Sequence, residues 1–332
     1  MDNKIDERNI LLDTADLKKY YVVKNSIFRN KRKVLKAVDG IDLRVYEGET
    51  VGLVGESGCG KSTLGRTILK LHSVTDGVIW YKGNHIENFG FEDMRQMRQK
   101  MQMIFQDPFA SLNPRMTIFQ SVKASLDAFN IGTQAERKER VEELLDYVGL
   151  GKNQINKYPH EMSGGQRQRV VIARAMVVNP EFVVCDEPVS ALDVSVRSQV
   201  LNLMKDMQQK NNLAYLFISH DLSVVRYLCD KIAVMYLGKI VELGSKEEIF
   251  EHPAHPYTKA LLSAIPVPDI NVKTKRIILK GDVPSPLNPP TGCRFHTRCP
   301  YATAECSQFE PKLTRLAKGH TVACFHAENI SD

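Results

Sequence analysis

Apolar runs that suit buried strands alternate with apolar positions at helical spacing over residues 1–250. The segment EGETVGLVG predicts a buried strand that enters a glycine-rich turn, and STLGRTILKLH follows with Leu64, Ile68 and Leu71 on one helical face. FVVC predicts a second buried strand, and LAYLFIS predicts a third that ends at His220. Strands that alternate with helices are typical of an α/β fold with a largely parallel sheet.

Two further segments have the period of amphipathic helices. In AERKERVEELLDYVGL the apolar positions recur three and four residues apart, and Gly149 provides a C-terminal cap. In QRQRVVIARAMVV the helical pattern stops at Asn179 and Pro180, directly before the FVVC strand. The apolar positions of the first of these helices are Val141, Leu144, Leu145 and Val148.

The pattern changes after Phe250, where prolines crowd the segments HPAHPY, IPVPD and VPSPLNPP. A compact core therefore gives way to an irregular C-terminal extension, and we expect one domain at 1–250 and the extension at 251–332. Within the extension, Pro256 opens a predicted short helix that Pro266 ends. The face expected to pack on the core comprises Tyr257, Ala260, Leu261 and Ala264.

Composition and charge narrow the class of protein. The chain has 332 residues, of which 43% are hydrophobic, enough for a sizeable core, and its net charge of +6 does not argue for nucleic acid. The start MDNKIDERNI lacks the order of a secretory signal, and apolar stretches such as VVIARAMVV are short and interrupted by Arg174. We therefore expect a globular intracellular protein without a membrane span.

The segment GESGCGKST fits the phosphate-binding pattern G-x-x-x-x-G-K-S/T, between a predicted strand and a predicted helix. Glycines let backbone N–H groups approach phosphates closely, and a helix N-terminus favours anions. Lys61 supplies a charge for the β- and γ-phosphates, and Ser62 supplies a hydroxyl for Mg²⁺. An ordinary glycine-rich turn with a chance lysine is the alternative. The residues expected to bind ATP here are Gly55, Glu56, Ser57, Gly58, Cys59, Gly60, Lys61, Ser62 and Thr63.

Polar residues after other predicted strands complete a candidate site for phosphoryl transfer. Asp186 would hold Mg²⁺, and Glu187 would polarise the attacking water. Gln106, in MIFQDP, could sense Mg²⁺ and the water, and His220 could donate a hydrogen bond to the γ-phosphate. Alone, an acidic pair after a strand is more often a turn, and a lone histidine is more often structural. Their weight comes from the phosphate-binding loop upstream.

Six motifs resemble those of ATP-binding cassette (ABC) proteins and occur in that family's order. GESGCGKST is similar to the Walker A loop, MIFQDP to the Q-loop, MSGGQRQR to the signature motif, FVVCDE to the Walker B strand, SALD to the D-loop ending at Asp193, and ISHD to the switch-histidine segment. The resemblance implies an α/β P-loop NTPase with a RecA-like core, an antiparallel β subdomain, an α-helical signature subdomain at 109–168 and a small irregular C-terminal extension.

The same resemblance implies an aromatic side chain, upstream of Walker A, that stacks on adenine. LKKYYVV points to Tyr21, with its neighbour Tyr20 as an alternative. Both tyrosines could instead pack under a sheet edge.

The signature motif implies a second cassette. In ABC proteins the residues at this motif bind the γ-phosphate of the nucleotide that the opposite cassette holds, with the helix N-terminus aimed at that anion. Here they are Ser163, Gly164, Gly165 and Gln166. Since the chain has one set of motifs, it must pair with itself or with a sister subunit. The family commonly pairs two different ATPases, so we expect a heterodimer, although the intact motifs allow a homodimer.

Two function classes follow: the motor of a membrane transporter, or a soluble ABC ATPase acting on ribosomes or DNA. Soluble members usually carry two cassettes or a long coiled-coil insertion, and the sequence has neither. FQDPFASLNPRMT and HPAHPYTKALLSAIP are similar to the ATPases of dipeptide, oligopeptide and nickel importers. The resemblance implies a motor driven by ATP and Mg²⁺ at the cytoplasmic face of the membrane, docked on two transmembrane permease subunits. These receive peptide from an external binding protein; nickel or another small solute stays an alternative.

Four of the seven cysteines lie in the extension with the spacing C-x5-C-x6-C-x17-C. Disulfides are disfavoured in an intracellular protein, which leaves a metal or a coincidence. Zinc suits four thiolates, but the spacing lacks the C-x2-C pairs of common zinc ribbons. Iron–sulfur clusters also take four thiolates. The four are Cys293, Cys299, Cys306 and Cys324, and the histidines that could substitute for one of them are His296, His320 and His326.

The peptide-importer ATPases that this chain resembles carry such a cysteine set in the same extension, where it binds a 4Fe-4S cluster. The resemblance therefore favours a 4Fe-4S cluster with a structural role, and zinc is the alternative.

Overall fold

The computed structural model describes residues 9–24, 32–265, 276–317 and 319–328. These residues form two compact units, each assembled from separate stretches of the chain. The first unit takes its residues from Met1–Leu11, Val45–Thr50 and Asn88–Ile218, and the second from Leu12–Arg44, Val51–Glu87 and Ser219–Asp332. The units follow a different division from the segments 1–250 and 251–332, and that boundary stays a prediction.

The first unit is built on parallel strands whose buried residues are mostly apolar. β6 (Met101–Ile104) pairs with β7 (Phe182–Asp186), and β7 pairs with β8 (Ala214–Ser219). Because all three run the same way, their carboxyl ends meet at one edge, which is where such sheets place their active sites. The predicted strands FVVC and LAYLFIS are therefore confirmed as β7 and β8.

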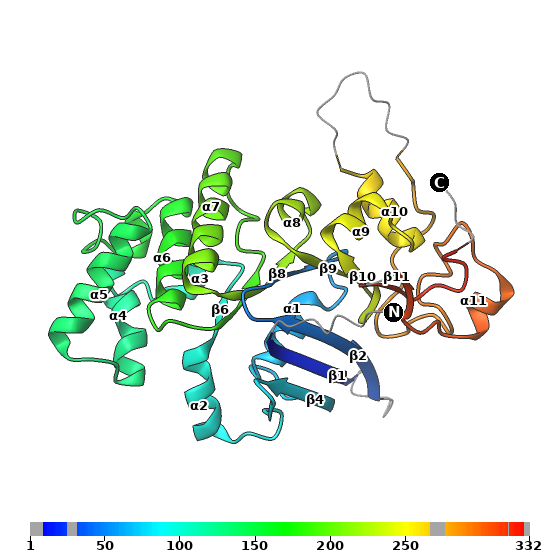
Figure 1. Ribbon diagram of the computed structural model, residues 1–332, viewed down its shortest axis with the longest axis horizontal. Coiled ribbons are helices and arrows are strands. Elements are labelled where there is room, and N and C mark those ends of the chain that lie inside the picture. Colours follow the sequence, from blue (N-terminus) through cyan, green and yellow to red (C-terminus); the bar gives the residue numbers. More distant parts are fainter. Residues whose placement is uncertain (1–8, 25–31, 266–275, 318, 329–332) are drawn as a thin grey trace. The chain divides into compact units, whose positions relative to one another are not determined.

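Helices surround these strands, and Figure 1 shows α4, α5 and α6 packed together. The predicted helix that Gly149 caps is confirmed as α5: Val141 and Leu145 are fully buried, and Gly149 has a φ of 78°, in the left-handed region. The helices of this unit are α2 (Phe91–Lys100), α3 (Pro108–Ser111), α4 (Ile118–Phe129), α5 (Gln134–Tyr147), the 3-10 turn Pro159–Glu161, α6 (Gly164–Met176) and α7 (Val194–Asn211).

Two sheets form the second unit. One is antiparallel, in the order β2-β1-β4-β5, and the other has the order β11-β12-β10-β9-β3, with β3 parallel to β9 and the remaining neighbours antiparallel. The strands are β1 (Ile10–Lys24), β2 (Arg32–Tyr46), β3 (Thr50–Val54), β4 (Asp76–Tyr81), β5 (Asn84–His85), β9 (Lys231–Tyr236), β10 (Lys239–Ser245), β11 (Thr314–Ala317) and β12 (His320–Val322). The helices are α1 (Lys61–Ile68), α8 (Leu222–Leu228), α9 (Lys246–Glu251), α10 (Pro256–Ser263) and α11 (Ala304–Gln308).

The prediction that Leu71 lies on the buried face of the helix after the phosphate-binding loop is wrong. Leu64 and Ile68 are fully buried, but Leu71 is 45% exposed. The helix ends at Ile68, and Lys70 turns into the left-handed region with a φ of 50°, so the 3.6-residue period no longer applies at Leu71.

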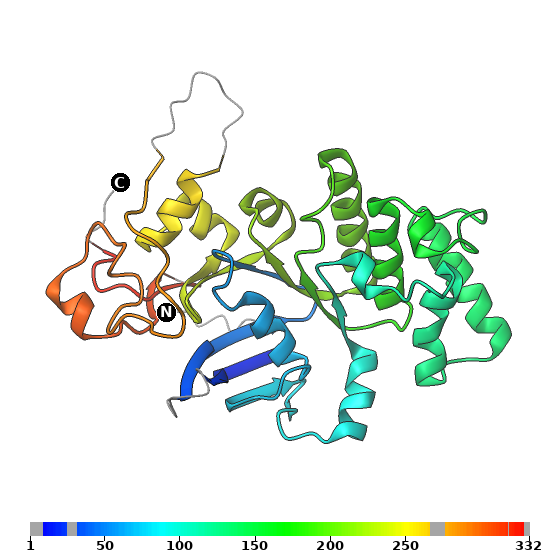
Figure 2. The same cartoon turned by 180° about the vertical axis from the view of Figure 1, so that it is seen from behind.

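The extension is more regular than its proline content predicts. It adds β12 to the edge of β10, where Glu242 faces Val322 and Leu243 faces Thr321. In Figures 1 and 2 the described residues from 276 onward lie, in orange and red, beside the yellow helices α9 and α10. The predicted helix at Pro256 is confirmed as α10, and Pro266 lies outside the described residues. None of the described helices combines the length and the apolar character that a membrane crossing requires.

Candidate functional site: two halves of an ATP site

The phosphate-binding loop belongs to the second unit and joins β3 to α1. Gly60 is the N-cap of α1, with a φ of 110°, and no side chain caps the amides of the first turn. Uncapped amides at a helix N-terminus are the donors that an incoming phosphate needs. The loop residues Ser57 and Gly58 are exposed, and Ser62 and Thr63 are half-buried. The loop therefore begins a helix with its first residues accessible, which is compatible with the anion site that the sequence predicts.

At two positions of the loop, glycine is required for a reason other than phosphate binding. A Cβ on Gly55 would lie 2.1 Å from the carbonyl oxygen of Met235, and a Cβ on Gly60 would lie 2.1 Å from that of Ala37. A Cβ on Gly58 would meet nothing within 4 Å. Gly58 is favoured by its left-handed φ of 80°, whereas Gly55 and Gly60 are also required by the neighbouring backbone.

Lys61 is 5% exposed and is held by its own loop. Its Nζ donates to the carbonyl oxygens of Gly55 at 2.7 Å and Glu56 at 3.0 Å. Burial raises the pKa of the nearby Cys59 thiol, and the Lys61 charge opposes that rise only in part. The lysine is thus positioned over the loop by neutral acceptors, which a phosphate can replace.

The acidic residues belong to the first unit and follow β7. Asp186 is fully buried at the end of the strand. Glu187 has a φ of 47°, a left-handed conformation that is uncommon for glutamate and that concentrates at functional sites. The Nε2 of Gln106 donates to Oε2 of Glu187 at 3.2 Å. The structure therefore brings together Gln106 and Glu187, which lie 81 positions apart in the sequence.

The signature residues form the start of α6 in the same unit. Ser163 is the N-cap: its Oγ accepts from the amide of Gln166 at 3.3 Å, and Oε1 of Gln166 accepts from the amide of Ser163 at 3.0 Å. Ser163 and Gly164 are exposed. A Cβ on Gly165 would lie 2.4 Å from Cγ1 of Val196, so this glycine is required by packing on α7. The motif therefore presents an ordered helix N-terminus to solvent.

The two remaining predicted residues, Asp193 and His220, lie at or just before the start of a helix. Asp193 is exposed and is the N-cap of α7, without a side-chain cap hydrogen bond. His220 is exposed and directly follows β8, one residue before the N-cap Asp221 of α8. Both residues therefore lie at the surface, directly before a helix.

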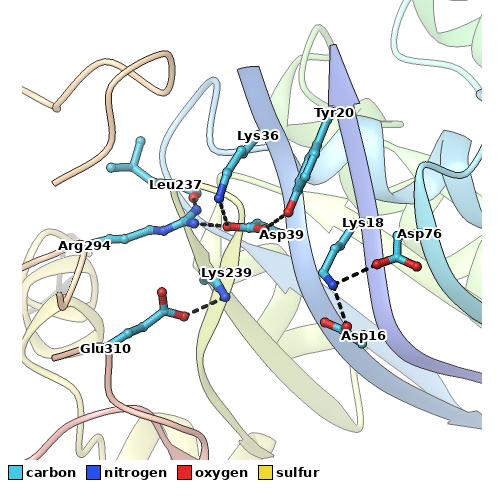
Figure 3. Close-up of polar contacts among 10 residues, drawn as sticks. All are labelled: Asp16, Lys18, Tyr20, Lys36, Asp39, Asp76, Leu237, Lys239, Arg294 and Glu310. Carbon is cyan, nitrogen blue, oxygen red and sulfur yellow. Dashed lines mark hydrogen bonds and ion pairs between the residues drawn. The ribbon is translucent and has the colours of Figure 1, made fainter. Parts of the chain in front are cut away.

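Of the two tyrosines on β1, Tyr20 is engaged by its hydroxyl. It donates to the carboxylate of Asp39, which also receives Arg294 from the extension and lies 3.7 Å from Nζ of Lys36 (Figure 3). Burial alone would raise the pKa of Asp39, but the Tyr20 hydrogen bond and the Arg294 charge outweigh it and lower the pKa. Tyr21 is half-buried and meets His72 edge to face at 5.9 Å between ring centroids. This geometry suits Tyr21 better than Tyr20 for contact with a base.

Sequence reasoning did not identify Arg294 as a contact to β2. Arg294 also donates to the carbonyl oxygen of Leu237, and its side chain is 7% exposed. The only signal was its place beside Cys293 in CRFHTRC, which says nothing about a partner 255 positions away.

The four cysteines of the extension gather in one place. The amide of Cys293 donates to the carbonyl oxygen of Cys306 at 2.8 Å. The pKa of Cys293 is raised to about 11, first by burial and then by the nearby thiols of Cys306, Cys324 and Cys299. Sγ of Cys306 also lies 3.6 Å from Nε2 of His326. Among the residues that the structure describes, no three or more histidine, cysteine, aspartate or glutamate side chains are placed as ligands of one metal ion.

The other three cysteines are buried. Cys59 is in the phosphate-binding loop and Cys185 is on β7, as predicted. Cys229 directly follows α8 and has an extended backbone conformation.

Comparison with known proteins agrees with this geometry. The family model described as ABC transporter matches residues 38–190, and the model described as oligopeptide/dipeptide transporter, C-terminal region, matches residues 241–306. A similar solved structure is the ATP-binding cassette MJ0796, a dimer in a post-hydrolysis state bound to ADP and Pi. It is 26% identical, covers 71% of this chain and 99% of its own, and has a TM-score of 0.64.

Two curated relatives cover nearly the whole chain. The oligopeptide transport ATP-binding protein AppF of Bacillus subtilis is 53% identical over 95% of this chain and 96% of its own length. The oligopeptide transport ATP-binding protein OppF of Salmonella typhimurium is 48% identical over 99% of this chain and 100% of its own. The chain therefore belongs to the ABC transporter ATPases, in the branch that carries the oligopeptide/dipeptide transporter C-terminal region.

Proposed function

We propose that this chain is the ATP-hydrolysing subunit of a peptide importer. The observation that carries the proposal is the pair formed by Gln106 and the left-handed Glu187 at the carboxyl edge of β7, beside the fully buried Asp186. This hydrogen bond holds the carboxylate that would polarise the attacking water, and phosphoryl transfer depends mainly on such positioning. The names of the relatives describe oligopeptide transport or peptide import, and they support peptides as the substrate class.

Each predicted residue has a place in this proposal. Lys61 and the amides of α1 bind the phosphates, and Tyr21 contacts adenine. Glu187 polarises the attacking water, and His220 donates to the γ-phosphate. Bound Mg²⁺ neutralises charge on the phosphates. The residues that would hold it are Ser62, Gln106 and Asp186, an all-oxygen set that suits this ion, and the buried carboxylate of Asp186 is the charge that it would balance.

The proposal includes a second cassette and membrane partners. The exposed helix N-terminus at Ser163 and Gly164 would meet the γ-phosphate on the opposite cassette, together with Gly165, Gln166 and Asp193. We infer a heterodimer with a second ABC ATPase, docked on two transmembrane permease subunits at the cytoplasmic face of the membrane. An external binding protein would deliver the peptide, and no nucleic acid is involved.

Glu187→Gln tests the assignment. The variant should bind ATP as the unchanged chain does, while the turnover rate of the intact transporter falls by about 10²–10⁴-fold because the water loses its base. Lys61→Ala should instead weaken nucleotide binding. Turnover near the unchanged rate in Glu187→Gln would contradict the role of Glu187.

Uptake of labelled dipeptide and oligopeptide, with nickel in parallel, identifies the substrate. Nickel uptake alone would overturn the peptide assignment.

We further propose that the cysteines of the extension hold a 4Fe-4S cluster. One zinc ion would draw its four sulfurs to about 2.3 Å from a single centre. A 4Fe-4S cluster spreads them, because each thiolate binds a different iron. The thiols of Cys306, Cys324 and Cys299 raise the pKa of Cys293, so the four side chains lie close together, which supports one shared centre. The residues that would hold it are Cys293, Cys299, Cys306 and Cys324, with His326 beside Cys306 as a substitute.

Metal analysis tests this second proposal. After anaerobic purification, the chain should absorb in the visible range and contain iron and sulfide, and Cys299→Ser should lose both. Cys229→Ser, on a buried cysteine outside the extension, should keep them. A colourless protein with stoichiometric zinc and no sulfide would replace the cluster by zinc, and a metal-free protein would reject both.

A further inference from the structure

One residue of the phosphate-binding loop is fixed at three of its polar groups. The backbone amide of Glu56 donates to the hydroxyl oxygen of Tyr257 at 2.8 Å. Its carboxylate receives a two-pronged contact from Arg298, with NH1 to Oε2 at 2.8 Å and NH2 to Oε1 at 3.1 Å. Its carbonyl oxygen accepts from Lys61. Two of the three partners therefore come from the C-terminal extension, more than 200 positions away.

Both extension residues are themselves rigidly held. Tyr257 is fully buried, and its ring lies 4.8 Å from that of Tyr236 and 5.4 Å from that of Phe295. The side chain of Arg298 is 8% exposed, and its guanidinium lies 6.0 Å from the centre of the Tyr236 ring. A paired arginine and carboxylate in fixed geometry lose little entropy when they bind, so this contact can define the position of Glu56.

The contact of Lys61 with the loop cannot serve that purpose during ATP binding. In the structure its ammonium rests on the carbonyl oxygens of Gly55 and Glu56. When it turns to the β- and γ-phosphates, those two hydrogen bonds are lost. Tyr257 and Arg298 contact the amide and the carboxylate of Glu56, whereas Lys61 contacts only its carbonyl oxygen. Movement of the lysine therefore breaks neither of the two contacts from the extension.

We propose that Arg298 and Tyr257 are positioning residues for ATP, which keep the phosphate-binding loop in its binding shape by fixing Glu56. The inference rests on the proposed ATPase function and deepens it, because it makes nucleotide affinity depend on the extension. A loop that is already ordered loses less conformational entropy on binding. The effect is therefore on affinity for ATP, and the chemical step at Glu187 is unaffected.

The test compares variants of the full chain in the assembled transporter. Arg298→Met keeps most of the apolar stem and removes the charge; the KM for ATP should rise about tenfold, with kcat changed less than about twofold. Arg298→Lys should restore part of the loss. Tyr257→Phe keeps the buried ring and removes only the hydroxyl, so the KM should rise about threefold. Matched controls in the same extension are Arg315→Met and Tyr301→Phe, which should leave the KM unchanged.

A double-mutant cycle isolates the contact. Glu56→Gln and Arg298→Met should each raise the KM, and the pair together should raise it no more than the larger of the two. A fully additive result, or a fall in kcat at constant KM, would overturn the inference. If Arg298→Met fails to fold, Tyr257→Phe decides, because its ring packing is retained.

Equilibrium binding of a fluorescent ATP analogue separates the two proposals. A wild-type complex that binds the analogue but hydrolyses no ATP would reject the proposed function, while weaker binding by the variants would still support positioning by the extension. Active hydrolysis with equal affinities in all variants would reject the positioning alone.

Discussion

The lysine of the phosphate-binding loop and the arginines of the C-terminal extension are held by contacts of opposite range. The loop positions its lysine through neighbours five and six residues away, Glu56 and Gly55. The extension is fixed by partners far along the chain: Arg298 pairs with Glu56 over 242 positions, and Arg294 pairs with Asp39 over 255. The short motif therefore accounts for the position of Lys61, whereas the contacts of the extension depend on residues far along the chain.

Breaking the Arg294–Asp39 pair should have the largest effect on stability. The two side chains are 7% and 9% exposed, and Arg294→Met would leave the Asp39 carboxylate buried and without its cation from the extension. Removing one partner of such a pair costs about 3–5 kcal/mol of unfolding free energy. Chemical denaturation of the variant and of Arg315→Met measures the difference. A loss below about 1 kcal/mol would mean that Tyr20 and Lys36 suffice to hold Asp39.

Substitutions of Gly60 and Gly58 test how much the loop depends on contacts with the neighbouring backbone. Gly60→Ala places a Cβ 2.1 Å from the carbonyl oxygen of Ala37, so the backbone must shift, and we expect a loss of about 2–3 kcal/mol in stability. Gly58→Ala is the control, because its φ of 80° is also left-handed while its Cβ would meet nothing within 4 Å. Equal losses for the two variants, measured by thermal and denaturant unfolding, would show that φ alone decides and that packing against Ala37 is unimportant.

The smallest expected effect is a pH dependence at the start of α10. Burial lowers the pKa of His255 to about 4, despite the opposing charge of Glu242, so the folded state keeps this histidine neutral. The unfolded state binds its proton near pH 6.5, so the stability that His255 contributes is complete above that pH and is lost as the pH falls towards 4.

His255→Asn keeps a side-chain acceptor at the N-cap and removes the titration. Between pH 7.5 and 5.5, the unchanged chain should lose about 1–2 kcal/mol more than the variant. Unfolding curves at the two pH values measure this difference, and parallel losses would contradict a neutral buried His255.

Much of the cassette can be predicted from the sequence because its strands, helices and motifs are encoded by residues that are close together in the chain. Apolar runs and helix stops locate β7, β8, α5 and α6, and the six motifs locate the residues of the candidate ATP site. Leu71 shows the limit of periodicity, since a left-handed turn at Lys70 ended the helix before it. Gly60 shows a second limit: its need for a bare backbone comes from Ala37, and a motif attributes it to phosphate alone.

The contacts of Arg294 and Arg298 could not be predicted for a different reason. Pairing across more than 240 positions depends on the tertiary arrangement, and an arginine in a proline-rich segment gives no indication of which carboxylate it will meet. The same holds for the meeting of Gln106 and Glu187, which only the parallel register of β6 and β7 explains.

The buried carboxylate of Glu242 shows that the cassette and the C-terminal extension cannot be exchanged independently of each other. It is fully buried on β10, accepts the amides of Ala254 and His255 at 2.7 and 3.0 Å, and lies 2.8 Å from Nε2 of His320. All three partners come from the extension, so a cassette cut at residue 250 would lose these three contacts of the Glu242 carboxylate. A chimera that exchanges extensions between relatives must therefore transplant Glu242, Asp39 and Glu56 together with the segment that recognises them.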